Sequence, residues 1–324
     1  MNRVLSGVRP SGKLHIGNYL GAIKQWVEMQ EKYDCYFMIA DLHAITSPYD
    51  PKTFQKDTME LLALYIAAGL DPQKCVLFCQ SDLPEHVELF WLLNTLVSIA
   101  ELQRMTQFKE KSQNEGQVIS AGLLNYPVLQ AADILLYQAD LVPVGEDQVQ
   151  HVELTRNLAR KFNSKYGKVF TEPKPLLTEE KRIMSLTDPT RKMSKTDPED
   201  SFIALTDSPE VIKTKIGKAT TDVGNEQEIS AGTKNLLGLM EAFGGKEEAE
   251  KWRKERETGT IKYSQFKPAL AEAIIKTLTP LQENYKKLAV DSEKLKQILQ
   301  EGNQRAQKVA SQTLEQAKKA VGLI

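Results

Sequence analysis

Two short stretches of the chain hold side chains whose types and spacing suit the binding of a polyphosphate. The first contains His15, Gly17 and Asn18 and follows a short apolar run at Val4 and Leu5. His15 and Asn18 can each donate a hydrogen bond to a phosphoryl oxygen, and Gly17 lets a flat base or a ribose approach the backbone. Alone, this stretch is explained as well by an ordinary capped helix as by a phosphate site.

The second stretch lies about 175 residues further along and contains Lys192 and Lys195, separated by Met193 and Ser194. Two lysines at this spacing can both face one anion from a loop, because lysine acts on phosphate as a mobile point charge. A solvated surface turn is the commoner explanation of such a loop. The two lysines therefore indicate a phosphate site only in combination with the first stretch.

The first stretch is expected at the start of a helix. Ile16, Leu20, Ile23 and Val27 recur at spacings of three and four residues and therefore share one helix face. N–H groups in the first turn of a helix have no intrahelical partner, and the helix dipole is positive there, so an anion is favoured. The sequence therefore predicts that a polyphosphate binds at this helix start.

Strands and helices alternate through the first half of the chain. Continuous apolar runs at residues 35–40, 76–79 and 142–144 are typical of parallel strands covered on both faces, and helices are predicted over residues 51–69 and 85–98. This alternation indicates βαβ units with right-handed crossovers. The predicted fold class is α/β, with a doubly wound, Rossmann-like parallel sheet that binds nucleotides.

Polar residues follow the predicted strands at the edge where such sheets bind ligands. Asp41 and His43 come after residues 35–40, although a structural hydrogen bond would explain His43 equally well. Gly145 and Asp147 follow a later strand, where Gly145 permits close approach and Asp147 can accept hydrogen bonds from two hydroxyl groups. Compensation of a helix dipole is the alternative explanation of the acidic residues there.

Asp133 is an acid within a strongly apolar run, residues 129–136. Aspartate is seldom buried without a partner, because an unpaired charge is difficult to remove from water. Its side chain must therefore be hydrogen-bonded, protonated or waiting for a ligand.

The second half of the chain shows no strand pattern after Ser208, which precedes a proline suited to the first position of a helix. Residues 168–191 are expected to be a proline-interrupted connection that leads to the lysine loop. We expect a Rossmann-like domain over residues 1–187 and an all-α domain over residues 188–324, whose last helix could pack back on the first domain. Helices are predicted there over residues 235–242, 264–289 and 292–320.

Composition bounds the size and the setting of the protein. The chain has 324 residues, of which 41% are hydrophobic, enough for two cores. No apolar run is long enough to span a membrane, and charges and glycines interrupt the first ten residues, where a leader would be apolar. We therefore expect a cytoplasmic protein.

Cysteine and charge patterns bear on metals and partners. Cys35, Cys75 and Cys79 are expected to be reduced, buried thiols, and without further Cys or His nearby they cannot build a zinc site, so no structural metal is expected. Residues 245–324 carry 16 Lys and Arg against 11 Asp and Glu, a local charge of +5 that leaves −6 elsewhere. This balance is compatible with a phosphate-backbone partner, but many solvated helices share it.

The two stretches together resemble the paired signatures of class I aminoacyl-tRNA synthetases, His-Ile-Gly-Asn at residues 15–18 and Lys-Met-Ser-Lys-Thr at residues 192–196. The joint match, in this order, is more specific than either piece. Further runs extend the resemblance over the whole chain, to the bacterial-type tryptophanyl-tRNA synthetases. These runs are residues 18–22, 40–46, 104–109, 131–137 and 143–148.

The resemblance implies a two-step reaction. L-Tryptophan is activated by ATP, with Mg²⁺ sharing the phosphate charge, and the acyl group is then transferred to tRNA(Trp). Both attacking oxygens come from substrates, so no protein nucleophile is implied. The resemblance further implies a homodimer with contacts from an inserted segment around residues 101–135, and helices that read the anticodon. Neither DNA nor a membrane is implied as a partner.

The resemblance also assigns roles position by position. Catalytic roles are implied for His15, Asn18, Lys111, Lys192 and Lys195. ATP contacts are implied for Arg9, Pro10, Ser11, Gly17, Asn18, Gly145, Glu146, Asp147, Ile183, Lys192, Met193, Ser194, Lys195 and Thr196. Tryptophan contacts are implied for Leu5, His43, Tyr126, Gln130, Asp133 and Gln148, with Asp133 accepting the indole N–H.

Four positions depart from the common family pattern. Arg9 stands where many relatives have glutamine, Gln130 replaces a methionine, Leu5 a phenylalanine and Thr196 a serine. The first two bear on substrate packing and not on the reaction class.

Three alternative functions remain open. A tyrosyl-tRNA synthetase shares the fold, and Gln130 before Ala-Ala-Asp is similar to that family. A small-molecule nucleotidyltransferase would carry the first stretch without using tRNA, and a tRNA-binding regulator would have lost catalysis. The lysine loop argues against the nucleotidyltransferase, and the intact His15, Asn18 and lysines argue against the regulator.

Overall fold

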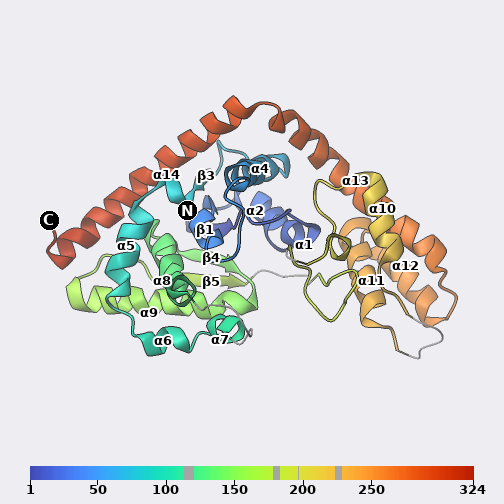
Figure 1. The fold of residues 1–324 in the computed structure, drawn as a ribbon, viewed down its shortest axis with the longest axis horizontal. Coiled ribbons are helices and arrows are strands. Elements are labelled where there is room, and N and C mark those ends of the chain that lie inside the picture. Colours follow the sequence, from blue (N-terminus) through green and yellow to red (C-terminus); the bar gives the residue numbers. More distant parts are fainter. Residues whose placement is uncertain (113–119, 178–182, 196, 223–227) are drawn as a thin grey trace.

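The structure is a computed structural model, and it describes residues 1–112, 120–177, 183–195, 197–222 and 228–324. Its centre is a five-stranded parallel sheet in the order β3-β2-β1-β4-β5 (Figure 1). This order confirms the predicted doubly wound α/β fold. The strands are β1 (Arg3–Val8), β2 (Asp34–Ile39), β3 (Val76–Cys79), β4 (Leu141–Val144) and β5 (Lys174–Leu177).

Helices cover the sheet and then continue as an all-helical region. Those between and beside the strands are α1 (Ile16–Asn18), α2 (Lys24–Met29), α3 (Asp41–Ala44), α4 (Phe54–Ala67), α5 (Glu85–Asn94), α6 (Ile99–Gln103), α7 (Thr106–Ser112), α8 (Ala121–Leu136) and α9 (Val149–Tyr166). The later helices are α10 (Pro209–Lys218), α11 (Ala231–Gly244), α12 (Lys246–Glu257), α13 (Tyr263–Ala289) and α14 (Ser292–Val321).

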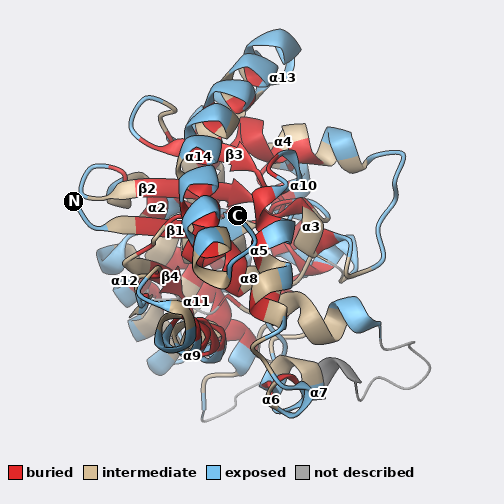
Figure 2. Ribbon diagram, turned by 90° about the vertical axis from the view of Figure 1, so that its left-hand side faces the viewer, coloured by how far each residue is buried: buried red, intermediate tan, exposed pale blue. Residues whose placement is uncertain are grey.

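Side chains of the strands alternate between two cores, as the two-residue period of a strand requires. Val4, Phe37 and Leu77 lie in the core that contains α2 and α4, whereas Leu5 and Tyr36 lie in the core that contains α5, α8 and α9. Figure 2 shows the strands among the most buried parts of the molecule. Burial on both faces explains why the strands appear in the sequence as continuous apolar runs.

The strand β5 was not expected, because residues 168–191 were predicted to be only a proline-interrupted connection. Lys174–Leu177 instead pairs in parallel with β4, with Pro175 opposite Val142. Proline cannot donate to a sheet ladder, but an edge strand pairs on one side only and tolerates it. The prediction was wrong because a proline in an edge strand looks like a strand breaker.

The helix predicted over residues 16–27 is present but irregular. The turn of α1 is followed by a π-helical segment at Tyr19–Ile23 and then by α2. Ile16, Ile23 and Trp26 are buried, so the predicted apolar face is retained. Single π-helical turns are frequent at functional sites, and this one brings Gly21 to the cavity described below.

The long helices α13 and α14 form a bent arm that reaches from the later helices back to α5 (Figure 1). α13 packs against α4 and α10, and α14 packs against β3 and α5. Gly302 of α14 lies so close to β3 that an added Cβ would stand 1.7 Å from the carbonyl oxygen of Leu77. One hydrophobic core runs from the sheet into α10–α13, and the boundary predicted at residue 187 stays a prediction.

Two expectations from composition can be compared with the structure. Cys35, Cys75 and Cys79 are free and buried, which confirms the predicted buried thiols, and burial raises the pKa of Cys35 and Cys75 to about 12. Within the described ranges, none of the helices is long and apolar enough to cross a membrane.

Candidate active site

A cavity of about 880 Å³ opens at the carboxyl ends of β1, β2 and β4. The strand order reverses between β1 and β4, and open parallel sheets bind ligands at such a switch point. Most of the predicted site residues line this one cavity. They are Leu5, Arg9, Ser11, His15, Asn18, His43, Tyr126, Gln130, Asp133, Gly145, Asp147, Gln148, Lys192, Met193, Ser194 and Lys195.

Four described residues among those predicted do not line the cavity, and two further predicted residues cannot be compared with it. Pro10 and Ile183 are buried, Gly17 lies beneath the ring of His15, and Glu146 is exposed outside the lining. Thr196 and the side chain of Lys111 lie outside the described residues. The backbone of Lys111 belongs to α7.

The lysine loop lies directly against the first stretch. Gly12 has a φ of +66°, and a Cβ added to it would stand 3.1 Å from Cβ of Lys195. Lys195 Nζ donates to the carbonyl oxygen of Arg9 at 3.2 Å. The two segments, remote in sequence, therefore form one wall of the cavity.

Backbone hydrogen bonds fix this meeting of the two segments. Ile16 N donates to Ile203 O at 3.0 Å, and Leu205 N donates to Leu14 O at 2.8 Å. The start of the lysine loop is tied in turn to Ile183, whose carbonyl oxygen accepts from the backbone N of the buried Met193 at 3.0 Å. The lysines are thus carried by a loop anchored at both ends.

His15 caps the first helix with its own side chain. Its Nδ1 accepts from the backbone N–H groups of Gly17 at 3.1 Å and Asn18 at 3.3 Å, and Asn18 Oδ1 accepts from His15 N. A Cβ on Gly17 would stand 3.0 Å from the imidazole. The N–H groups of Gly17 and Asn18 are therefore already bonded to the imidazole, and Gly17 is required by the ring above it.

The cap leaves His15 Nε2 as the protonated nitrogen of a neutral ring. Burial, followed by the charges of Lys195 and Lys192, lowers the pKa of His15 to about 3. Burial and the nearby Arg9 guanidinium lower the pKa of Lys195 to about 8. This wall can therefore offer a neutral N–H donor and lysine charges to a polyphosphate.

Asp133 is buried at the other end of the cavity and is ionised. Its Oδ2 accepts from His43 Nε2 at 2.7 Å, and its Oδ1 accepts from Gln80 Nε2 at 2.8 Å and His86 Nδ1 at 2.6 Å. Burial would raise the pKa of Asp133, but its electrostatic interactions and hydrogen bonds with His43 and His86 outweigh this effect and lower the pKa to about 2. His43 therefore both lines the cavity and holds the acid.

Gln80 and His86 were missed from the sequence. Gln80 directly follows β3, so the rule that ligands bind beyond the carboxyl ends of parallel strands could have found it. No comparable signal marks His86, which lies within the apolar helix α5. Its role comes only from the packing of α5 on α8.

A second polar group lines the same cavity, and its Tyr126 ring lies 6.3 Å from the ring of His43. The hydroxyl of Tyr126 donates to Gln107 Oε1 at 3.0 Å and lies 2.9 Å from Nε2 of the buried His151. Gln148 Nε2 donates to Asp147 Oδ2 at 2.9 Å. Gln107 and His151 were not predicted. This group offers oxygens to an ammonium group or to hydroxyl groups.

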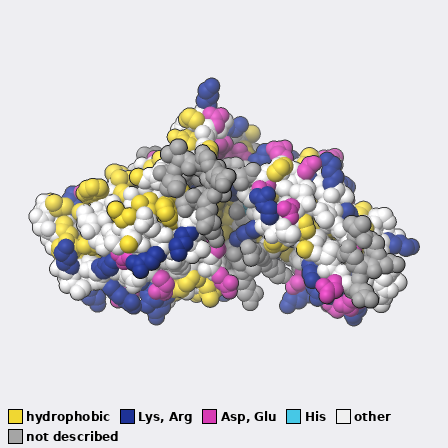
Figure 3. Space-filling view, turned by 60° about the horizontal axis from the view of Figure 1, so that its bottom comes forward, with side chains coloured by type: hydrophobic (Ala, Val, Ile, Leu, Met, Phe, Trp, Pro, Cys, Tyr) yellow, Lys and Arg dark blue, Asp and Glu magenta, His cyan; other side chains and the backbone are white. Residues whose placement is uncertain are grey.

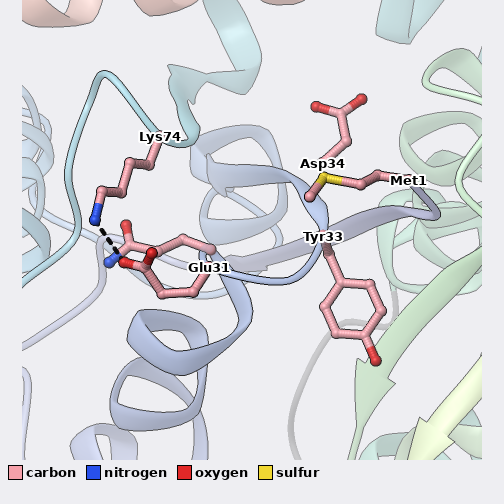
Figure 4. A pocket seen from close by; sticks show the side chains of 6 residues that line it. Met1, Glu31, Tyr33, Asp34 and Lys74 are labelled. Carbon is pink, nitrogen blue, oxygen red and sulfur yellow. Dashed lines mark hydrogen bonds and ion pairs between the residues drawn. The ribbon is translucent and has the colours of Figure 1, made fainter.

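A separate pocket of about 620 Å³ lies at the amino ends of β1 and β2 (Figure 4). Met1, Tyr33 and Asp34 line it, and Lys74 forms an ion pair with Glu31 at 2.6 Å. Parallel sheets place their ligands at the opposite edge. The cavity at the carboxyl ends is therefore the candidate active site.

Comparison with known proteins agrees with this geometry. Residues 1–279 match the model of the family described as tRNA synthetases class I (W and Y). The chain is 47% identical to a tryptophan–tRNA ligase of Clostridium tetani, over 99% of this chain and 96% of that protein.

Solved structures give the same result. The tryptophanyl-tRNA synthetase of Mycoplasma pneumoniae is 38% identical with a TM-score of 0.87, covering 99% of this chain and 98% of that one. The enzyme of Campylobacter jejuni, solved with ADP and tryptophan, is 35% identical with a TM-score of 0.86, covering 99% of both chains. This chain therefore belongs to the tryptophan–tRNA ligases, within the class I tRNA synthetases.

Proposed function

We propose that this protein activates L-tryptophan with ATP to form tryptophanyl-adenylate and then transfers the tryptophanyl group to tRNA(Trp). The observation that carries the proposal is that one cavity joins two chemically different ends. At one end stand the neutral donor His15 and the lysine loop, and at the other stands the ionised Asp133. A triphosphate suits the first end, and the indole N–H suits the second.

ATP occupies the wall built from the two signature segments in this proposal. His15 and Asn18 donate to phosphoryl oxygens, and Lys192 and Lys195 neutralise the charge that develops on the leaving pyrophosphate. Roles for Lys111 and Thr196 at the phosphates are proposed from the family signatures alone. Arg9, Ser11, Met193 and Ser194 complete the contacts, with Ile183 beneath the nucleotide.

Tryptophan occupies the inner end. Leu5 and Gln130 pack against the indole, and Asp133 accepts its N–H. The ionised Asp133 disfavours phenylalanine, because the remaining acceptor position on its carboxylate would stay unpaired in the buried site. A tyrosine pocket needs a partner for a phenol that both donates and accepts, and an ionised acid can only accept. This asymmetry favours tryptophan over the tyrosyl alternative.

The polar group around Tyr126 orients the reacting atoms. Gln148 and Tyr126 contact the α-amino group, and Asp147 with Gly145 contacts the ribose of ATP. The tryptophan carboxylate oxygen then attacks the α-phosphorus, and the bond to pyrophosphate breaks. In the second step a terminal ribose hydroxyl of tRNA attacks the acyl carbon and AMP leaves. The protein's part is positioning and electrostatic stabilisation.

ATP enters as its Mg²⁺ complex in this proposal. Mg²⁺ keeps several waters and binds substrate phosphates readily. Across the described residues, no three His, Cys, Asp or Glu side chains are grouped so that they could hold a metal ion. The lining therefore fits a metal that arrives on the phosphates and adds charge neutralisation there, rather than one caged by protein carboxylates.

The remaining proposals concern assembly and setting. Residues 1–187 would form the catalytic part, and the helices of residues 188–324 would read the anticodon. Val87 and Trp91 of α5 lie one helical turn apart with 50% and 64% exposure, and Ile99 of α6 is 66% exposed. Exposed apolar side chains of this kind mark interaction surfaces, which supports a homodimer. We propose a cytoplasmic location, as for protein synthesis.

The test is ATP–pyrophosphate exchange with each amino acid, followed by charging of bulk tRNA. We expect exchange to depend on tryptophan and to be far slower with tyrosine or phenylalanine. Tyrosine-dependent exchange would establish the tyrosyl alternative instead. Exchange without charging would indicate a small-molecule nucleotidyltransferase. The absence of both activities would indicate a regulator.

A further inference from the structure

The two oxygens of Asp133 are held from different sides. Oδ1 accepts two hydrogen bonds, from Gln80 and His86, and neither of these residues lines the cavity. A carboxylate oxygen has two lone-pair sites. Oδ1 is therefore saturated by groups behind the cavity wall.

Oδ2 is held by a single donor, and that donor lines the cavity. His43 Nε2 donates to it at 2.7 Å, and both His43 and Asp133 belong to the lining. One lone pair of Oδ2 is left for a further donor. Because Gln80 and His86 fill Oδ1, a ligand in the cavity has to donate to Oδ2.

His86 is itself held in one state. It is fully buried, its ring stacks on Phe78 with centroids 6.0 Å apart, and Nε2 lies 2.9 Å from the hydroxyl of Tyr137. An ionised carboxylate can only accept, so Nδ1 carries a proton, and a phenol that donates to Nε2 fixes this tautomer. Tyr137 is fully buried as well, so bulk solvent does not reach its hydroxyl.

We propose that His86 is a positioning residue for tryptophan selection. It fills Oδ1 of Asp133, so that the indole N–H meets an open acceptor only at Oδ2, and Tyr137 holds His86 in the tautomer that can do this. The inference rests on the proposed function and adds a residue that never touches the substrate. Without the His86 donor, the carboxylate could turn and present its charge in another direction.

The experiment compares two amides at position 86. His86→Asn places an N–H donor where Nδ1 stands, within reach of Asp133, whereas His86→Gln carries its amide one atom further, toward Tyr137. His86→Leu removes both the Nδ1 donor and the Nε2 acceptor. For each variant, kcat/KM in pyrophosphate exchange is measured with tryptophan and with β-(benzothiophen-3-yl)alanine, in which sulfur replaces the indole N–H.

The informative quantity is the ratio of kcat/KM for tryptophan to that for the analogue. We expect the Gln and Leu variants to lower this ratio roughly tenfold or more, as for loss of a hydrogen bond to a charged group. The Asn variant is expected to keep the ratio within about threefold. If the Leu variant does not fold, the difference in this ratio between the Asn and Gln variants still tests the proposal.

Two results would overturn the inference. One is an equal fall for both substrates in the Gln variant, which would make His86 a purely structural residue. The other is an Asn variant that loses selectivity as much as Gln. A wild-type protein without tryptophan-dependent exchange would instead refute the proposed function, before any variant is made.

Discussion

Asp133 combines deep burial with a full charge, and this combination decides what the cavity can select. Asp133→Asn keeps the shape but replaces one acceptor by an N–H₂ group that faces the donors of His43 or of Gln80 and His86. Donors that face donors stay unsatisfied in the buried site. We expect kcat/KM for tryptophan in pyrophosphate exchange to fall roughly 100-fold, with a much smaller change for phenylalanine.

The KM for ATP is the internal control for this variant, because the proposed ATP site is the wall that contains His15 and Lys195, not the surroundings of Asp133. An unchanged KM for ATP would show that the damage is local. Unaltered discrimination against phenylalanine and tyrosine would show that Asp133 does not select tryptophan.

Lys195 provides a prediction in pH. Its pKa is lowered to about 8 by burial and by Arg9, so the free enzyme loses this charge as the pH rises through that value. kcat/KM for ATP reports groups of the free enzyme and should therefore decline above pH ~8. Bound triphosphate stabilises the ammonium, so kcat should decline only at higher pH.

Two variants separate Lys195 from other titrating groups. In Lys195→Arg the guanidinium does not titrate in this range, and the decline should disappear even if the rate is lower. Lys195→Ala should slow activation by roughly 100-fold with a far smaller loss of ATP affinity, since a transition-state contact is removed. Equal losses of rate and affinity would mean that Lys195 binds ground state and transition state alike.

Among the helices and strands, the sequence predicted those features that local residue patterns determine. The apolar strand runs and the cap and proline of α10 follow from residue types and known geometry. The contact of the first stretch with Lys195 was expected from the family resemblance of the two signatures. The contacts of His86 and the strand containing Pro175 could not be predicted in this way. The first depends on helix packing, and the second on a strand lying at the sheet edge.

The contact between α14 and β3 makes a prediction about stability. A Cβ on Gly302 would stand 1.7 Å from Leu77 O, whereas nothing lies within 4 Å of a Cβ built on Gly238 of α11. Alanine stabilises a helix interior by roughly 0.5–1 kcal/mol relative to glycine. Gly238→Ala should therefore be neutral or stabilising, while Gly302→Ala should lower the free energy of unfolding by roughly 1–3 kcal/mol through overpacking.

Urea unfolding of the two variants measures the difference directly. A Gly302→Ala protein as stable as Gly238→Ala would mean that α14 does not pack on β3 as described. Helix propensity cannot explain a difference of opposite sign, because both glycines are replaced within helices.

Over the whole molecule, α14 ties the later helices to the substrate cavity. Asn303 accepts from Cys79 N at 2.9 Å and donates to Asp82 at 2.6 Å, and these two residues flank Gln80, which holds Asp133. Ala306 and Ala310 belong to the core of the sheet. A chain cut after residue 206 would expose that core, so loss of charging in such a fragment would not identify the helices as the anticodon-reading part.

Ionic strength tests the role of the helices in the full chain. Residues 245–324 carry a local charge of +5. Figure 3 shows Lys and Arg side chains, together with Asp and Glu, on both halves of one face of the molecule. Affinity for a nucleic-acid backbone falls steeply with salt, because bound counterions are released. Raising KCl from about 50 to about 200 mM should therefore raise the KM for tRNA by roughly tenfold or more.

Tryptophan activation in the same buffers is the control. The charges of its substrates and of the residues that bind them interact within a cavity, where salt screens them less than on the surface. We expect its kcat/KM to change by less than about twofold over this range. Conversely, a KM for tRNA that stays constant while activation falls would place the dominant electrostatic contacts at the ATP site. The basic balance of residues 245–324 would then reflect solvated helices alone, and anticodon reading would have to rest on uncharged contacts.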